Sequence, residues 1–251
     1  MSKLTIADYD VFDFSALAGR HDVTHTVYHN GEGSPVVLIQ ELPGIGQATL
    51  RLAEKLIAAG HTVFMPHLFG PIGKVSMVGN IARVFCMRRE FSLFSARKSS
   101  PIVDWLRALC QQVKADTGAK GVGVIGMCLT GNFAITLIAD DSVLAAVSSQ
   151  PAMPLGKQGA LHMSDEEIEQ VKLALDHKAP AKVYRFEGDK LSTAEKYACL
   201  HETFNQDKER IELNVLPGDA HSVLTLDFVD EEGHPTYQAL EEIKAYFRAE
   251  L

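Results

Sequence analysis

Short apolar runs alternate with amphipathic stretches along most of this chain. Several of the runs are apolar on consecutive positions, which is typical of strands covered on both faces of a sheet. Their regular alternation with helical patterns favours parallel strands joined by crossover helices. Strands are predicted over residues 22–29, 35–40, 61–66, 121–126, 144–149, 181–188 and 211–217.

The segments between these runs carry apolar residues at helical spacing. The first of them stops at Gly60, and glycine commonly ends helices because it adopts left-handed backbone conformations. Ser164 followed by Glu166 and Glu167 indicates the start of another helix. Helices are predicted over residues 47–60, 100–118, 129–139, 164–177, 192–206 and 236–251.

These elements predict an α/β fold with a mostly parallel central sheet flanked by helices on both faces. A chain of 251 residues can bury one large core, although its length would also fit two small domains. No repeat or linker divides the chain, so we expect a single domain over residues 1–251. An insertion around residues 70–99 is long enough to cover a pocket.

Composition and charge narrow the classes of function. The formal net charge of −8 argues against a nucleic-acid partner, because phosphate backbones usually bind a concentrated cationic surface. Asp8, Asp10 and Asp13 interrupt the N-terminal segment, and no stretch approaches the roughly 18 apolar residues of a membrane helix. We therefore expect no membrane association and a cytoplasmic protein.

Cysteines and histidines do not indicate a metal site. The four cysteines lie far apart with no C-x-x-C pair, so we expect reduced thiols rather than disulfides or a zinc site. His21, His25 and His29 are spaced four apart, but four residues of a strand span about 13 Å, too far for two ligands of one ion. No metal is expected.

The stretch GVGVIGMCLTG, residues 121–131, holds the strongest candidate for chemistry. An apolar strand pattern ends there at Cys128, with the small residues Gly126 and Thr130 two positions to either side. This is the pattern of a nucleophile elbow, a strand-to-helix turn so tight that its neighbours must be small. The turn lifts the side chain above the sheet edge and places it at a helix N-terminus, which favours the reactive thiolate.

Two other interpretations of this stretch remain open. A free cysteine is often a small apolar filler of the core. Gly121, Gly123 and Gly126 also fit G-x-G-x-x-G, the dinucleotide-binding fingerprint. In that fingerprint the glycines follow the strand, whereas here apolar residues place them inside it, and the next predicted strand ends in SSQ without an acid. This context argues against a dinucleotide.

An α/β-hydrolase requires an acid and then a histidine after late strands, in that chain order. Asp189 lies just past one late predicted strand, and His221 lies on the loop after the last. Taken singly, Asp189 could be a turn residue and His221 is one of ten histidines. Their joint occurrence in the required order favours a catalytic set with Cys128. Asp219 is a rival acid, but it precedes the histidine on the same loop.

Four segments resemble the dienelactone hydrolase family, a branch of the α/β-hydrolases whose nucleophile is usually cysteine: VVLIQELPGI, VFMPHLFG, GMCLTG and PGDAHS. The resemblance covers most of the chain, although Thr130 stands where the family often has a second glycine. It implies an α/β-hydrolase fold, with Cys128 as the nucleophile, His221 as its base and Asp189 as the group that orients the imidazole.

The resemblance also implies roles for the segment that follows VVLIQ. Glu41 corresponds to the family's acid beside the thiol, which accepts the thiol proton when substrate displaces it. The backbone N–H groups of Leu42 and Leu129 would hold the oxyanion. The expected activity is hydrolysis of small carboxylic esters or lactones through an acyl-thioester intermediate, without a cofactor.

The sequence defines the substrate-binding residues less closely. Arg88 and Arg89 belong to a basic cluster in the insertion, where a bidentate arginine would suit a carboxylate substrate, although such a cluster is often a solvated helix face. His67, in the loop after a predicted strand, is a further candidate for the pocket. One alternative function is an esterase or thioesterase with an unrelated substrate. Another is a non-catalytic or thiol-sensing protein that retains the elbow.

Overall fold

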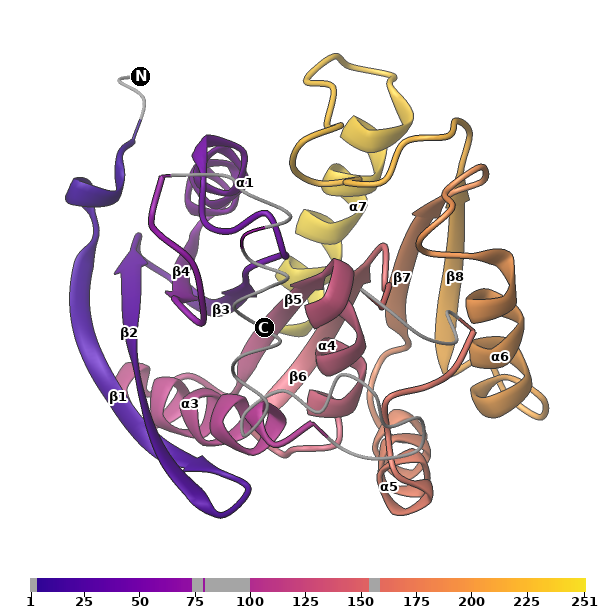
Figure 1. The fold of residues 1–251 in the computed structure, drawn as a ribbon, viewed down its shortest axis with the longest axis horizontal. Helices are drawn as coiled ribbons and strands as arrows, with labels where there is room; N and C mark the ends of the chain where they lie inside the picture. Colours follow the sequence, from indigo (N-terminus) through magenta and orange to yellow (C-terminus); the bar gives the residue numbers. More distant parts are fainter. Residues whose placement is uncertain (1–3, 74–78, 80–99, 154–158) are drawn as a thin grey trace.

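The computed structural model describes residues 4–73, 79, 100–153 and 159–251 (Figure 1). Its eight strands form one sheet in the order β1-β2-β4-β3-β5-β6-β7-β8. β2 is antiparallel to both of its neighbours, β1 and β4. The remaining strands, β3 to β8, are all parallel to one another. The strands are β1 (Asp10–Ala18), β2 (His21–Asn30), β3 (Ser34–Ile39), β4 (His61–Pro66), β5 (Val122–Met127), β6 (Val143–Ser149), β7 (Ala181–Phe186) and β8 (Ile211–Leu216).

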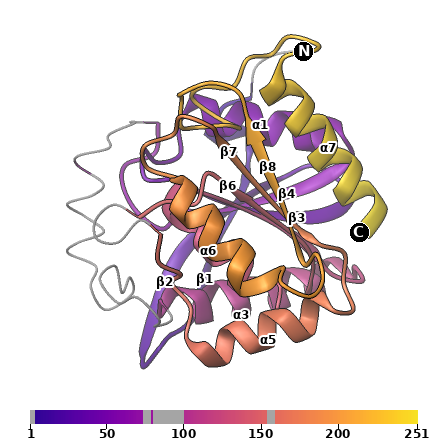
Figure 2. The same cartoon turned by 90° about the vertical axis from the view of Figure 1, so that its right-hand side faces the viewer.

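Helices cover both faces of the sheet. They are α1 (Gln47–Ala58), α3 (Ile102–Thr117), α4 (Gly131–Leu137), α5 (Asp165–Leu175), α6 (Ala194–Phe204) and α7 (Pro235–Glu250). Figure 2 shows α1 and α7 on one side of the sheet and α3, α5 and α6 on the other. Each side has its own buried apolar cluster, because the strands of the sheet centre are apolar on both faces. The predicted α/β-hydrolase fold with a mostly parallel central sheet is confirmed.

The strand at one edge of the sheet, β1, is absent from the predicted elements. It pairs antiparallel with β2 along its whole length. Phe12, Phe14 and Ala16 turn toward the core, and the ring of Phe14 packs edge-on against Trp105 at a centroid distance of 5.3 Å. The opposite face is exposed and carries the polar Asp13 and Ser15 between Val11 and Leu17. The alternation of apolar and polar residues in VFDFSALA is the local signal for this strand, because an edge strand covered on one face has a period of two.

The carboxyl ends of the parallel strands meet at one edge of the sheet, which we call the carboxyl edge. Glu41 lies just past β3, Cys128 directly follows β5 and Gln150 directly follows β6. Asp189 follows β7, and His221 lies on the loop after β8. Parallel sheets gather functional groups at this edge because the loops after the strands converge there. The proposed site residues therefore share one edge although they are far apart in the sequence.

Candidate active site

The turn after β5 has the geometry of a nucleophile elbow. Cys128 has a φ of 56°, a left-handed conformation that is uncommon for a residue with a Cβ. A Cβ on Gly126 would lie 2.2 Å from the carbonyl oxygen of Thr130, so only glycine fits there. The chain begins a short 3-10 turn at Cys128 and continues as α4 from Gly131. The cysteine thus sits in a strained backbone conformation between a strand and a helix.

The hydroxyl of Thr130 forms hydrogen bonds that a second glycine could not form. Its hydroxyl is fully buried and accepts a hydrogen bond from the N–H of Met127 at 2.9 Å. The same hydroxyl donates toward the carbonyl oxygen of Gln40 at 3.1 Å. Thr130 therefore ties the elbow to the end of β3, from which Glu41 and Leu42 continue.

The acid and the histidine predicted from the sequence meet in the structure. Nδ1 of His221 donates to Oδ2 of Asp189 at 2.8 Å, and the aspartate is 5% exposed. Oδ1 of Asp189 accepts hydrogen bonds from the N–H groups of Leu191 (2.8 Å) and Ser192 (3.1 Å). These bonds orient the carboxylate toward the imidazole. The rival acid, Asp219, is exposed, and Asp189 is the carboxylate bonded to the ring.

The imidazole of His221 is influenced by both Asp189 and Cys128. Burial by itself lowers the pKa of His221, but the hydrogen bond to Asp189 and the nearby sulfur of Cys128 raise it to about 10. Nε2 of the ring is buried and has no hydrogen-bond partner among the described residues. Nδ1 is bonded to Asp189, so Nε2 is the ring nitrogen that remains for the nearby sulfur of Cys128.

Glu41 is a buried carboxylate bound to the loop that carries the histidine. Oε1 accepts from the hydroxyl of Thr225 at 2.5 Å, and Oε2 accepts from the hydroxyl of Ser222 at 3.2 Å. The amide of Gln150, which has a φ of 38°, reaches Oε2 at 3.4 Å. Burial raises the pKa of Glu41, while the two hydroxyls and the charge of His221 act in the opposite direction. Sequence analysis did not identify these three partners of Glu41.

The two candidate oxyanion donors lie in buried backbone next to the elbow. Leu42 and Leu129 are buried in the same apolar cluster as Cys128. The carbonyl of Cys128 accepts from the N–H of Ala152 at 3.1 Å. Because a trans peptide points its N–H opposite to its carbonyl, this bond fixes the direction of the Leu129 N–H. A turn closed by the Gly44 N–H and the carbonyl of Glu41 (2.9 Å) holds the segment that contains Leu42.

The remaining substrate-binding candidates are placed only in part. Nε2 of His67 donates to the carbonyl of Gly70 at 2.5 Å, so the ring is engaged within its own loop. Burial lowers the pKa of His67, and the Gly70 carbonyl opposes this shift. The side chain of Gln40 bonds to the backbone of Leu68 and Phe69 and thereby fixes the same loop beside the end of β3. Arg88 and Arg89 lie outside the described residues.

The other motifs of the sequence have structural roles. Gly123 lies inside β5, where a Cβ would come within 2.9 Å of the Phe247 ring, so its small size lets α7 pack closely. The histidines of the HDVTHTVYH segment lie along β2. In the described part of the chain, no three histidine, cysteine or acidic side chains gather closely enough to hold a metal ion. Among the described helices, none has the length and apolar character needed to cross a membrane.

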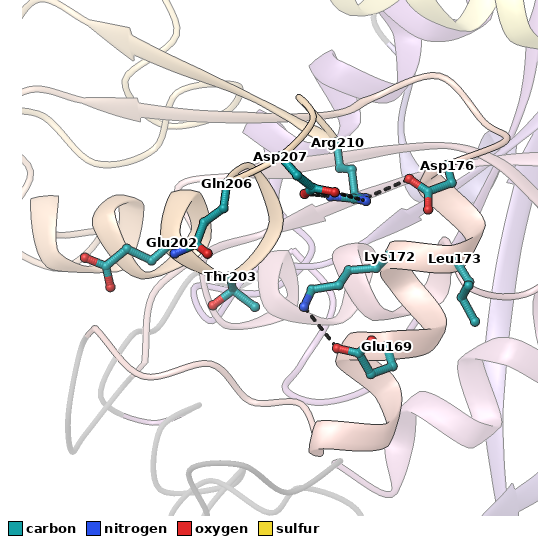
Figure 3. A pocket seen from close by; sticks show the side chains of 9 residues that line it. All are labelled: Glu169, Lys172, Leu173, Asp176, Glu202, Thr203, Gln206, Asp207 and Arg210. Carbon is teal, nitrogen blue, oxygen red and sulfur yellow. Dashed lines mark hydrogen bonds and ion pairs between the residues drawn. The ribbon is translucent and has the colours of Figure 1, made fainter.

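A groove of about 380 Å³ lies at the other end of the sheet, between α5 and α6 (Figure 3). Arg210, at the start of β8, bonds there to Asp176 (2.9 Å) and to Asp207 (2.5 Å). Lys172 pairs with Glu169 at 3.0 Å. Both cations that line this groove are thus paired with carboxylates, and the groove is remote from the carboxyl edge.

Comparison with known proteins supports the family resemblance. The sequence model of the Dienelactone hydrolase family matches residues 24–251. A search of curated protein sequences finds no match. The dienelactone hydrolase of Anabaena variabilis has a similar structure, with a TM-score of 0.60 at 17% identity over 97% of this chain and 99% of that one.

Two further solved structures share the fold. An esterase of Pyrococcus furiosus has a TM-score of 0.63 at 15% identity, covering 100% of this chain and 95% of that one. A dienelactone hydrolase-like promiscuous phosphotriesterase from metagenomic libraries has a TM-score of 0.62 at 14% identity, covering 94% of this chain and 98% of that one. The family match extends over most of the chain, and the fold agrees with it. This chain therefore belongs to the dienelactone hydrolase family and is a carboxylic ester hydrolase.

Proposed function

We propose that this chain hydrolyses small carboxylic esters or lactones with Cys128 as the nucleophile. The observation that carries the proposal is the hydrogen bond between Nδ1 of His221 and Asp189, which leaves Nε2 to the sulfur of Cys128. The raised pKa of His221, about 10, supports an imidazole that can hold the proton given up when the sulfur of Cys128 attacks. A cysteine that merely filled the core would need neither this partner nor a strained backbone.

In the first half of the reaction, the sulfur of Cys128 attacks the carbonyl carbon of the ester. The carbonyl oxygen becomes an oxyanion, which the N–H groups of Leu42 and Leu129 stabilise. When the carbon–oxygen bond to the alcohol breaks, the imidazolium of His221 gives its proton to the leaving oxygen. The acyl group is then bound to Cys128 as a thioester, and a lactone would remain tethered as one open chain.

In the second half, the now neutral imidazole takes a proton from water, and the hydroxide attacks the thioester carbon. The carbon–sulfur bond breaks, the carboxylic acid leaves and the thiolate re-forms against the imidazolium. Asp189 keeps the ring in the required orientation through both steps. Glu41, whose pKa burial raises, is proposed to accept the thiol proton in enzyme molecules whose cysteine is protonated when substrate enters.

The known relatives support the ester class. Membership of the dienelactone hydrolase family favours enol esters and lactones, and the similar structure from Pyrococcus furiosus is described as an esterase. Cys128, Leu42 and Leu129 belong to one buried apolar cluster, which suits a small uncharged acyl group. The specific ester is left to a substrate panel.

The test combines turnover with detection of the acyl-enzyme. Wild type, Cys128→Ala and the control Cys199→Ala are assayed with p-nitrophenyl acetate, dihydrocoumarin and a dienelactone. Cys199 is a partly exposed free cysteine on α6, outside the site. We expect Cys128→Ala to lose activity and Cys199→Ala to keep it, and quenched wild type to carry one acyl group on Cys128 by mass spectrometry.

Equal turnover by Cys128→Ala and wild type would overturn the mechanism. Rapid alkylation of Cys128 without turnover of any ester or lactone in the panel would instead favour a thiol-sensing protein that retains the elbow.

A further inference from the structure

A buried cation lies beneath the loop that carries Asp189. Arg185, near the end of β7, is 5% exposed. Its Nη2 donates to the carbonyl of Glu187 at 2.7 Å, and its Nε donates to the carbonyl of Ser192 at 2.7 Å. The guanidinium therefore bonds to both ends of the loop formed by residues 187–192, which we call the acid loop.

The acid loop holds its aspartate by backbone groups. The N–H of Ser192 donates to Oδ1 of Asp189, while the carbonyl of the same residue accepts from Arg185. Ser192 is thus fixed on both sides. Movement of Ser192 would remove one of the two backbone hydrogen bonds on Oδ1, which together set where Oδ2 points.

The acid loop is also joined to the loop that carries the histidine. The N–H of Glu187 donates to the carbonyl of Leu216 at 2.8 Å, and the N–H of Gly188 donates to the carbonyl of Gly218 at 2.8 Å. A Cβ on Gly188 would lie 2.9 Å from that of Asp219, so the two loops approach closely. Arg185 bonds to Glu187, and it therefore holds the point where the acid loop contacts the loop of His221.

Arg185 is itself held on its other side. Its guanidinium lies over the ring of Tyr197 on α6, 5.3 Å from the ring centroid, and the Tyr197 hydroxyl donates to the carbonyl of Asn214 at 3.2 Å. A planar guanidinium can stack on the ring and bridge two carbonyls at once, whereas a lysine ammonium is a single flexible point charge. The contacts require arginine rather than a positive charge alone.

We propose that Arg185 is a positioning residue of the reaction, which clamps the acid loop so that Oδ2 of Asp189 faces Nδ1 of His221. This inference rests on the proposed function, because it assigns Arg185 a role in keeping that acid and base aligned. Arg185 itself touches no reacting atom.

Arg210 provides a matched control. It is also a buried arginine, 7% exposed, and it bonds to Asp176, Asp207 and the carbonyl of Phe204 at the amino end of β8. Replacement of Arg210 should lower the stability of the protein without changing the geometry at the carboxyl edge. Comparison of Arg185→Lys with Arg210→Lys therefore separates positioning from general destabilisation.

The experiment measures kcat, KM and the NMR titration of the His221 ring in wild type and both variants. For Arg185→Lys we expect kcat to fall about tenfold or more with KM changed less than about twofold, since an interaction made in the transition state is lost. Lysine keeps the positive charge, so a change in the pKa of His221 would report the geometry. A weaker hydrogen bond between His221 and Asp189 should lower that pKa. Arg210→Lys should change neither kcat nor that pKa. Arg185→Gln, which keeps an amide NH₂ donor group but no charge, is measured as a second variant in case Arg185→Lys does not fold.

The inference is overturned if folded Arg185→Lys retains wild-type kcat and the wild-type titration of His221. It is also overturned if Arg210→Lys lowers both to the same extent. Failure of the proposed function looks different, because Cys128→Ala would then keep full activity. The NMR titration reports the alignment of Asp189 and His221 in either case.

Discussion

Arg210 at the amino ends of the strands and Arg185 near their carboxyl ends are buried to almost the same degree, 7% and 5% exposed. Arg210 bonds to two carboxylates, those of Asp176 and Asp207, and so lies among opposite charges (Figure 3). Arg185 bonds to two backbone carbonyls that shape the loop of Asp189. Arginine thus pairs with carboxylates at the amino ends, as Arg210, and holds the loop that orients a carboxylate at the carboxyl ends, as Arg185.

The difference extends to the neighbouring groups. At the amino ends, the bonds to Arg210 lower the pKa of Asp207 to about 2, so the pair stays charged over the ordinary pH range. At the carboxyl edge, burial raises the pKa of Glu41, and the pKa of His221 rises to about 10. Cys128 adds a strained backbone. Shifted pKa values and strain gathered at one edge are the marks of a reactive site, whereas matched ion pairs serve the fold.

The largest effect should follow from Asp189→Asn. Loss of the carboxylate removes the group that orients the imidazole, so kcat should fall by about 10²- to 10⁴-fold. The pKa of His221 should fall from about 10 toward its ordinary value of 6.5. The control is Asp219→Asn, which removes the exposed rival acid and should leave kcat unchanged. Loss of activity in Asp219→Asn with full activity in Asp189→Asn would reverse the assignment.

The same variant should change the pH dependence of stability. The folded-state pKa of His221 is raised, so its contribution is complete below about pH 6.5 and is lost as the pH rises through about 10. Between these pH values the free energy of unfolding of wild type should therefore fall more steeply than that of Asp189→Asn. Urea unfolding at a series of pH values measures both slopes, and equal slopes would contradict the raised pKa.

Thr130→Val should have the next largest effect. Valine keeps the shape but leaves the buried N–H of Met127 without the hydroxyl that accepts it, at a cost of about 1–3 kcal/mol. The link to Gln40 is lost as well, so kcat should fall with the stability. Thr136→Val is the control, because the Thr136 hydroxyl donates within its own helix, to the carbonyl of Asn132. Denaturant unfolding and initial rates test both variants.

Glu41→Gln should separate stability from activity. Burial raises the pKa of the Glu41 carboxyl group in the folded state. Its ionisation therefore destabilises the fold as the pH rises from the pKa of the unfolded state through that of the folded state. Above that range the glutamine variant should be more stable than wild type, by about 1 kcal/mol, while it turns over ester more slowly. Thermal unfolding at pH 4 and pH 8 tests the sign, and a variant equally destabilised at both would contradict it.

Asp207→Asn should have the smallest effect. The group is exposed at the amino ends, far from the carboxyl edge, so kcat and KM should not change. Its folded-state pKa lies at about 2, so its contribution is present above the unfolded value and is lost as the pH falls through about 2. Unfolding above pH 3.8 should therefore show a small loss of stability in the variant, and this difference should disappear in acid. A change in kcat would contradict the separation of Asp207 from the carboxyl edge.

Much of the fold could be read from local patterns. A buried strand needs a run of apolar residues and an amphipathic helix needs apolar residues at its own period, so β3 to β8 were predicted within a few residues. The elbow could be found because a tight turn demands small neighbours, as the close approach of Gly126 to Thr130 demonstrates. β1 was missed although its alternation is local. Arg88 and Arg89, the predicted substrate-binding arginines, lie outside the described residues.

The sequence by itself determined most of the elements, the elbow at Cys128 and the chain order of Cys128, Asp189 and His221. Only the tertiary structure decided which groups hold them. Glu41 receives its bonds from Ser222 and Thr225, which are more than 150 residues away along the chain. Arg185 was indistinguishable from any other charged residue until its bonds to the acid loop were known. Local periodicity records how each segment buries its own surface, whereas these contacts exist only because parallel strands bring separate loops to one edge.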